Sequence, residues 1–203
     1  MQQTSMCRLM ALAALAVAVV LFVTSKNALG QDVPFAICSF SNAQTTGAPD
    51  ATLRLVNDGA SGDATPAGDL CAAIYVFNFD EQLTECCSCK VTPNGLLTLS
   101  VDQDLTSNPL TPRVPHRGVI KTISSAVPSD GICDPRAVVL KLGIKGWITH
   151  VQNAGTGNWS ITEDSLTNAR LGLAEFTDLQ DDCANLIELG SGYGSCDCTD
   201  RTI

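Results

Sequence analysis

Hydrophobic and polar positions alternate along much of the chain with a period of two, which is typical of β-strands that bury one face. Other segments are short apolar runs rich in β-branched and aromatic residues, and clusters of Gly, Pro, Asn and Asp separate them. The predicted strands are residues 51–56, 71–79, 86–91, 96–101, 118–126 and 137–151. The last range is either one long strand or a hairpin that breaks near residues 143–146.

The connections between these strands carry turn and loop signals. The stretch Thr92-Pro93-Asn94-Gly95 ends in Asn-Gly between two strand patterns, which predicts a type I′ hairpin joining residues 86–91 to residues 96–101. Residues 57–69, 102–117 and 127–136 are predicted loops, and residues 153–158 a turn.

The pattern changes to a helical period near the C-terminus. Apolar residues at positions 173, 176, 179, 183, 186 and 187 recur at helical spacing, with acidic residues on the opposite face. Gly190 is a suitable residue to end such a helix. We therefore predict a mainly β fold, an antiparallel β-sandwich of Ig-like architecture, with a C-terminal α-helix at about 173–189 held by disulfides.

The N-terminus has the layout of a secretory signal peptide. Arg8 precedes an uninterrupted apolar run at residues 9–23, and small residues stand just before Gln31. The alternative is an uncleaved membrane anchor, but a spanning helix needs about 20 apolar residues. We predict a signal peptide at 1–30, a variable lead-in at 31–50 and a single domain at 51–203. The mature protein would be secreted, extracellular or periplasmic, with no membrane span after cleavage.

Nine cysteines follow the predicted cleavage site, which in an exported protein indicates a disulfide framework with one cysteine left over. Cys38 is the candidate for the odd cysteine because it stands alone near the mature N-terminus. It is either free or linked to another chain. The predicted disulfide cysteines are Cys71, Cys86, Cys87, Cys89, Cys133, Cys183, Cys196 and Cys198.

The most distinctive cysteine cluster is Cys86-Cys87-Ser88-Cys89. In a strand, Cys87 and Cys89 share one face and Cys86 points to the other, so these cysteines would bridge to different segments rather than to each other. Cys196 and Cys198 have the same spacing of two. Tying the tail to the cluster would close loops of about a hundred residues, each bridge contributing about 4–5 kcal/mol on the chain-entropy model. A metal-thiolate site and redox catalysis are the alternatives.

Charge narrows the classes of partner. Removal of residues 1–30 takes away Arg8 and Lys26 and no acid, leaving 10 basic against 21 acidic residues and a net charge of −11. Such a protein repels phosphate backbones and anionic lipid surfaces, so we expect no nucleic-acid partner.

Candidate catalytic and metal-binding residues are few. His116 and His150 are too far apart in sequence to indicate a histidine site, and G-x-S-x-G and H-E-x-x-H are absent. The acid pair Glu163 and Asp164 and the acids at 80, 81 and 85 are weak glycosidase candidates. We expect no cofactor.

Calcium is a weaker candidate. Asp102 and Asp104 begin an oxygen-rich loop, but Ser107 and Arg113 stand where an EF-hand requires Gly and Glu. Asp102 and Asp104 therefore belong either to a looser calcium site or to a solvated turn.

Two tryptophans are candidates for a binding surface. Trp147 lies in a strand pattern and is predicted to be core, whereas Trp159 adjoins a Gly/Asn turn and is the predicted exposed residue. Asn158-Trp159-Ser160 is also a glycosylation sequon in a eukaryotic context.

Two stretches together resemble a known group of proteins. Residues 69–109 (DLCAAIYVFNFDEQLTECCSCKVTPNGLLTLSVDQDLTSNP) and 189–198 (LGSGYGSCDC) are similar to a family of secreted, cysteine-rich bacterial proteins of unknown function. They cover about a quarter of the chain. The resemblance implies a bacterial exported protein and the eight-cysteine framework above. It implies no activity and no functional residue.

These observations favour a secreted, non-enzymatic structural or binding domain of the cell surface or extracellular matrix. Its partner would be a protein or a carbohydrate, and an oligomer is compatible with the sequence. The alternative is a secreted hydrolase whose active site is assembled from dispersed residues, including His116 or His150.

Overall fold

The computed structural model describes residues 34–59, 68–108, 114–191, 196 and 198. The predicted signal peptide lies outside these residues. Nine strands are described: β1 Phe35–Ser41, β2 Thr52–Asn57, β3 Leu70–Asn78, β4 Leu83–Val91, β5 Leu96–Ser100, β6 Arg117–Ala126, β7 Ile144–Gly155, β8 Asn158–Ser165 and β9 Thr167–Asn168. The helical elements are η2 Val101–Leu105, α2 Leu173–Leu186 and η3 Ile187–Ser191. The mainly β prediction with a C-terminal helix is confirmed.

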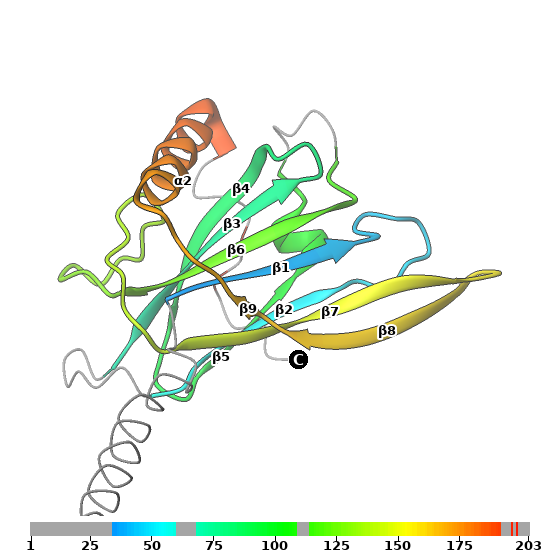
Figure 1. Ribbon diagram of the computed structural model, residues 1–203, viewed down its shortest axis with the longest axis horizontal. Coiled ribbons are helices and arrows are strands. Elements are labelled where there is room, and N and C mark those ends of the chain that lie inside the picture. The colour runs from blue at the N-terminus through cyan, green and yellow to red at the C-terminus, as the bar shows by residue number, and fades with distance from the viewer. Residues whose placement is uncertain (1–33, 60–67, 109–113, 192–195, 197, 199–203) are drawn as a thin grey trace, which may run out of the picture. The chain divides into compact units, whose positions relative to one another are not determined.

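The strands form two antiparallel sheets (Figure 1). Sheet A has the order β4-β3-β6-β1-β9, and sheet B has the order β5-β2-β7-β8. Within them, β3–β4 and β7–β8 are hairpins of consecutive strands, and the other connections between consecutive strands pass from one sheet to the other. The sandwich is therefore confirmed, and its Ig-like detail stays a prediction.

The larger hydrophobic core lies between the inner faces of the two sheets. Leu53 and Leu55 of β2 and Leu97 and Leu99 of β5 are buried there, where they face Ile74 of β3. Alternate positions of β2 and β5 are more exposed, so the period of two in the sequence corresponds to an inner and an outer face.

A second core lies on the outer face of sheet A, beneath α2. Leu179 and Cys183 of the helix are buried against Tyr75 of β3 and Ile123 of β6. Strand β3 is therefore covered on both faces, which explains its nearly continuous apolar sequence. The Tyr75 hydroxyl donates to the Pro135 carbonyl oxygen at 2.6 Å. This bond fixes the loop between β6 and β7 to the second core.

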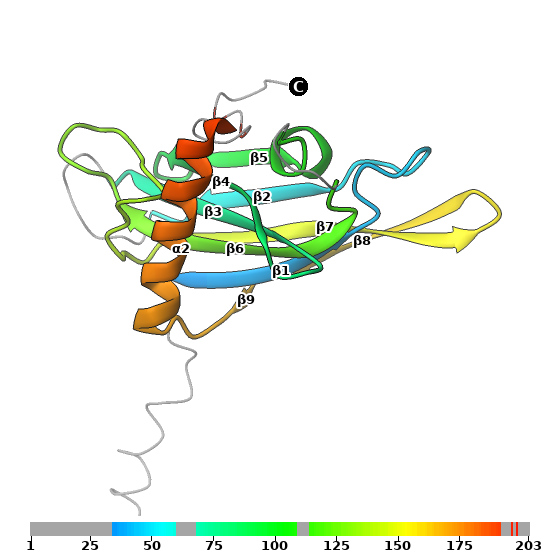
Figure 2. The same cartoon turned by 90° about the horizontal axis from the view of Figure 1, so that it is seen from above.

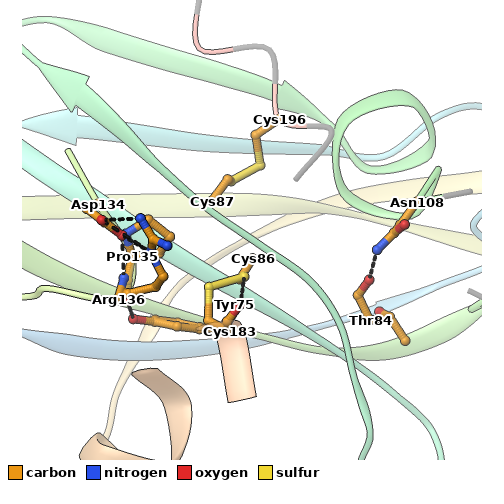
Figure 3. The surroundings of a disulfide bond; sticks show 10 residues. All are labelled: Tyr75, Thr84, Cys86, Cys87, Asn108, Asp134, Pro135, Arg136, Cys183 and Cys196. Carbon is orange, nitrogen blue, oxygen red and sulfur yellow. Dashed lines mark hydrogen bonds and ion pairs between the residues drawn. A yellow bond between two sulfur atoms is a disulfide. The ribbon is translucent and has the colours of Figure 1, made fainter. Parts of the chain in front are cut away.

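The disulfides join the C-terminal part of the chain to β4. Cys86 bonds Cys183 on the outer face of sheet A, while Cys87 bonds Cys196 on the inner side (Figure 3). The remaining described pairs are Cys89–Cys198 and Cys71–Cys133. The eight cysteines that the sequence assigns to bridges are the eight that pair.

The turn at Thr92-Pro93-Asn94-Gly95 is a turn, but the predicted hairpin is wrong. Strand β4 belongs to sheet A and β5 to sheet B, so this turn carries the chain across the sandwich. The Gly95 amide donates to the Thr92 carbonyl at 2.8 Å, and Asn94 has φ of 59°. A proline at the second position with positive φ at the third is the type II pattern, whose twist does not match that of paired strands.

Three other element predictions need correction. Residues 35–41 are not a lead-in but form β1, paired with β6, so the folded domain begins before residue 51. Residues 137–143 contain an isolated bridge, Ser125 with Leu140, and β7 begins only at Ile144. The predicted loop 102–117 begins within a π-helical turn, η2.

Candidate binding cleft

A cleft opens at the side of the sandwich where β1 of sheet A faces β7 of sheet B. The chain leaves β8 beside it and crosses to sheet A, where β9 pairs with β1 through Ile37 and Thr167. The Leu166 amide donates to the Gly146 carbonyl at 2.9 Å during this crossing. The cleft has a volume of about 320 Å³, and its lining residues are Ile37, Cys38, Ser39, Ile148, His150, Asp164, Ser165 and Thr167.

Strand register places an imidazole and a carboxylate together in this cleft. Asp164 of β8 lies opposite Ile148 of β7, and His150 is two residues further along β7, so the three share one face of sheet B. The His150 Nε2 and the Asp164 Oδ2 are 3.3 Å apart. The histidine side chain is 17% exposed and the aspartate 72%, so the pair spans the depth of the cleft.

Cys38 contributes a thiol from the β1 wall. Its side chain shares a strand face with Phe40 and packs against the core between the sheets. It is the free cysteine of the described residues, and burial raises the pKa of its thiol to about 12. At neutral pH the group is therefore a thiol rather than a thiolate, which makes it a weak nucleophile.

The cleft consequently suits hydrogen bonding better than covalent catalysis. The imidazole of His150 and the carboxylate of Asp164 lie on one face of sheet B, and the polar residues Ser39, Ser165 and Thr167 also line the space that a ligand group could fill. Within the described part of the chain, no three His, Cys, Asp or Glu side chains converge as metal ligands.

The other predicted site residues lie elsewhere. The Nδ1 of His116 is 2.7 Å from the Ala43 carbonyl oxygen, and His116 is not among the residues that line the cleft. Glu163 forms an ion pair with Arg54 on the opposite face of β8 from Asp164, so the predicted acid pair does not form.

The calcium candidates Asp102 and Asp104 lie in η2 and accept hydrogen bonds from backbone amides outside it. An oxygen of Asp102 accepts the Gln44 amide at 2.8 Å, and an oxygen of Asp104 accepts the Ser100 amide at 2.7 Å. Asp104 is almost fully buried. Asp104 therefore acts as a local acceptor at the start of η2, whereas Asp102 joins η2 to the loop after β1.

Both tryptophans are half-buried. Trp159 is half-buried and packs against the core between the sheets, whereas Trp147 belongs to neither core. Trp147 pairs with Arg54, which alternates with the buried Leu53 and Leu55, so both face outward from sheet B. The prediction of a core Trp147 is wrong because strand patterns alone do not say which face is inward, and a binding surface at Trp159 stays a prediction.

Sequence reasoning missed the grouping of Cys38 with His150 and Asp164. The available signal was the stretch 35–41, which is free of Gly and Pro and contains the β-favouring residues Phe35, Ile37 and Phe40. Recognising a strand there would have placed Cys38 in a sheet. Its position opposite β7 depends on strand order, which no local pattern encodes.

None of the helices in the described residues has the length and apolar character needed to cross a bilayer. No protein-family model matches the chain, and no curated protein matches it either. Among solved structures, it is similar to the crystal structure of Thermotoga maritima 1070, with 11% identity and a TM-score of 0.39. That likeness covers 65% of this chain and 89% of the other, and it carries no argument about function.

Proposed function

We propose that this chain is an exported, non-enzymatic binding domain of the cell surface or extracellular matrix, and that its cleft holds a carbohydrate group. The observation that carries the proposal is the lining of the cleft, where the imidazole of His150 and the carboxylate of Asp164 lie together among polar residues at the edge of a disulfide-bonded sandwich. Sugars present several hydroxyls that both donate and accept hydrogen bonds. A carboxylate accepts from such hydroxyls, while an imidazole and serine or threonine hydroxyls can do both.

Export is supported by the bridges and by the leader-like sequence. Four disulfides among the described residues are typical of proteins that fold in an oxidising compartment. We expect the exported protein to begin at Gln31 and its mass to rise by eight hydrogens on reduction. A mass that includes residues 1–30, or several thiols before reduction, would contradict export with cleavage.

Binding can be tested with a glycan array probed by the labelled, disulfide-intact protein. We expect at least one class of oligosaccharide to bind, and Asp164→Asn to weaken this binding at least about tenfold, because hydrogen bonds to charged groups are the stronger ones. Glu163→Gln is the matched control, since Glu163 is the next residue on β8 but faces away from the cleft. Absence of glycan binding, or equal effects of the two variants, would contradict a carbohydrate site.

The second candidate is a thiol-dependent hydrolase, and the grouping of Cys38, His150 and Asp164 favours it. Against it stands the high pKa of the Cys38 thiol, because thiol hydrolases use a thiolate. Hydrolysis of p-nitrophenyl acetate decides between them. Turnover that both Cys38→Ala and His150→Ala abolish would establish the hydrolase and overturn the non-enzymatic proposal.

A further inference from the structure

A half-buried apolar strip of sheet A lies beside α2, on the outer face that the helix partly covers. The helix crosses the strands over one row of side chains, formed by Lys121 of β6, Tyr75 of β3 and Cys86 of β4. Glu175 near its start pairs with Lys121 at 2.8 Å, and Cys183 near its end bonds Cys86. Eight helical residues span about 12 Å, which matches the width of two strand spacings, about 10 Å. In Figure 2 the helix runs across the strands of sheet A.

The next row along these strands is apolar and only half-buried. It consists of Val119 of β6, Phe77 of β3 and Leu83 of β4, which are cross-strand neighbours in register. We call these three residues the strip. Beyond the strip lie Phe79, which is 44% exposed, and Arg117, whose guanidinium stands 5.2 Å from the Phe79 ring centre.

The flank of α2 that faces the strip is acidic. Gln180, on the other flank, accepts the Val138 amide at 3.2 Å, and Val138 packs with Ile123 on the far side of the helix from the strip. Successive residues of an α-helix are rotated by about 100° around its axis. Asp178 and Asp182 therefore lie on the flank opposite Gln180, which is the flank that faces the strip. Both are exposed. On its α2 side the strip is therefore bordered by the carboxylates of Asp178 and Asp182, and at its β6 end by Lys121, whose ammonium stands 4.6 Å from the Phe77 ring centre and is paired with Glu175.

We propose that this strip docks an amphipathic α-helix of a partner protein, with apolar side chains on Val119, Phe77 and Leu83 and lysines or arginines facing Asp178 and Asp182. Charge complementarity points to this occupant, because an apolar floor beside a row of carboxylates matches a helix that is apolar on one face and basic on one flank. The net charge of −9 for the whole chain also favours approach of a basic segment.

Dimensions agree with a second helix alongside the first. Side-chain rows on a strand are about 7 Å apart, and packed helices lie about 8–10 Å apart axis to axis. A helix parallel to α2 at that distance would rest over the strip and reach toward Phe79. This surface is separate from the cleft, which opens between the sheets rather than on the outer face of sheet A.

The probe is a fluorescent 16-residue helical peptide with leucines at helical spacing and lysines along one flank. A second peptide carries glutamates at the lysine positions. The disulfide-intact protein is titrated against each, and binding is followed by anisotropy. We expect the lysine peptide to bind and the glutamate peptide to bind at least about tenfold more weakly.

Two charge reversals on α2 provide a matched comparison. Asp178→Lys and Asp181→Lys change the net charge equally, but Asp181 lies on the solvent side of the helix, away from the strip. We expect Asp178→Lys to weaken binding about tenfold and Asp181→Lys less than twofold. Equal effects would mean attraction to the acidic protein as a whole and would overturn the site.

The apolar strip is tested by Val119→Glu, with circular dichroism confirming that the sheet is intact. We expect this variant to abolish peptide binding, and unchanged binding would overturn the proposal, as would failure of the lysine peptide to bind at millimolar concentration. Sedimentation of the protein alone tests whether a second copy of the chain occupies the strip. A dimer that Val119→Glu dissociates would show that a second copy, not a partner helix, covers the strip. None of these readouts depends on Asp164 or on glycan binding.

Discussion

At the scale of single residues, Cys38 combines exposure to a cleft with an environment that suppresses its reactivity. Its half-buried side chain packs against the apolar core between the sheets, and desolvation disfavours the thiolate. The folded state therefore holds the thiol proton more tightly than the unfolded state. This contribution to stability is present below the unfolded pKa near 9.0 and is lost as the pH rises toward about 12.

We predict slow alkylation of Cys38 in the folded protein. At pH 8 a pKa of about 12 rather than 9.0 lowers the thiolate fraction about a thousandfold, and the greater intrinsic nucleophilicity of the thiolate recovers part of this. The net rate with iodoacetamide should be about 40-fold below that of the guanidinium-unfolded protein. The rate should also keep rising with pH above 9. Equal rates for folded and unfolded protein at pH 8 would contradict the buried thiol.

Asp102 offers a second test at this scale. Burial raises the pKa of its carboxyl, and the Asp50 carboxylate adds to this, whereas the hydrogen bond from the Gln44 amide opposes it. A raised pKa of an acid means that its ionisation at neutral pH disfavours the folded state. Asp102→Asn keeps an acceptor oxygen for Gln44 and removes the charge.

We therefore expect Asp102→Asn to melt at or slightly above the temperature of the native protein at pH 7, with the difference vanishing at pH 3. Thermal unfolding by circular dichroism measures both. A lower melting temperature at pH 7 would show that the charge itself is required. If millimolar calcium then stabilised only the native protein, the weak calcium prediction for Asp102 and Asp104 would hold.

At the scale of elements, the close approach of neighbouring strands depends on one glycine. Gly118 in β6 lies where a Cβ atom would overlap the carbonyl oxygen of Phe77 and would stand 2.9 Å from the Phe40 ring. The carbonyl belongs to the backbone of β3 and cannot turn aside. The pairing of β6 with β3 therefore leaves no room for a side chain at this position.

We predict that Gly118→Ala lowers the free energy of unfolding by about 3 kcal/mol, at the upper end of the usual cost of overpacking. Gly172→Ala is the control, since a Cβ there meets nothing within 4 Å. It should cost no more than about 1 kcal/mol, because alanine is a poorer helix N-cap than glycine. Urea unfolding measures both, and equal losses would mean that crowding at β6 is not the cause.

At the scale of the whole molecule, the bridges from β4 act as one clamp. Cys87–Cys196 and Cys89–Cys198 each join residues 109 apart in sequence. However, the bridges are side by side, so each closes only a ring of a few residues once the other has formed. Once Cys86 and Cys183 are joined, the loop that Cys87–Cys196 and Cys89–Cys198 must close is also shorter. The sequence estimate of about 4–5 kcal/mol for each bridge treats them as independent.

We predict that their removal is non-additive by about 1 kcal/mol. On the chain-entropy model, Cys87→Ala with Cys196→Ala should cost about 2 kcal/mol, and Cys89→Ala with Cys198→Ala about the same. Removing both bridges should cost about 5 kcal/mol, because the second removal opens a loop of about 15 residues. Guanidinium unfolding of the three variants tests this. A fourfold variant whose loss equals the sum of the two pairs would contradict the clamp.

The local pattern of the chain determined most of its elements. Alternation at 51–56 and 96–101 predicted β2 and β5, the apolar run at 71–79 predicted β3, and helical spacing near 179 and 183 predicted α2. The faces of Cys86, Cys87 and Cys89 also followed from strand geometry. These features depend on backbone periodicity, which is a property of consecutive residues.

Only the tertiary structure decided which strands share a sheet and which faces turn inward. Pro93 and Asn94 carry the chain between sheets rather than into a hairpin, and Trp147 faces outward while Trp159 packs inward. Strand order also brings Cys38 beside His150, 112 positions away in sequence. Each outcome depends on long-range pairing, whose free energy comes from burying two sheets against each other and is not carried by any single segment.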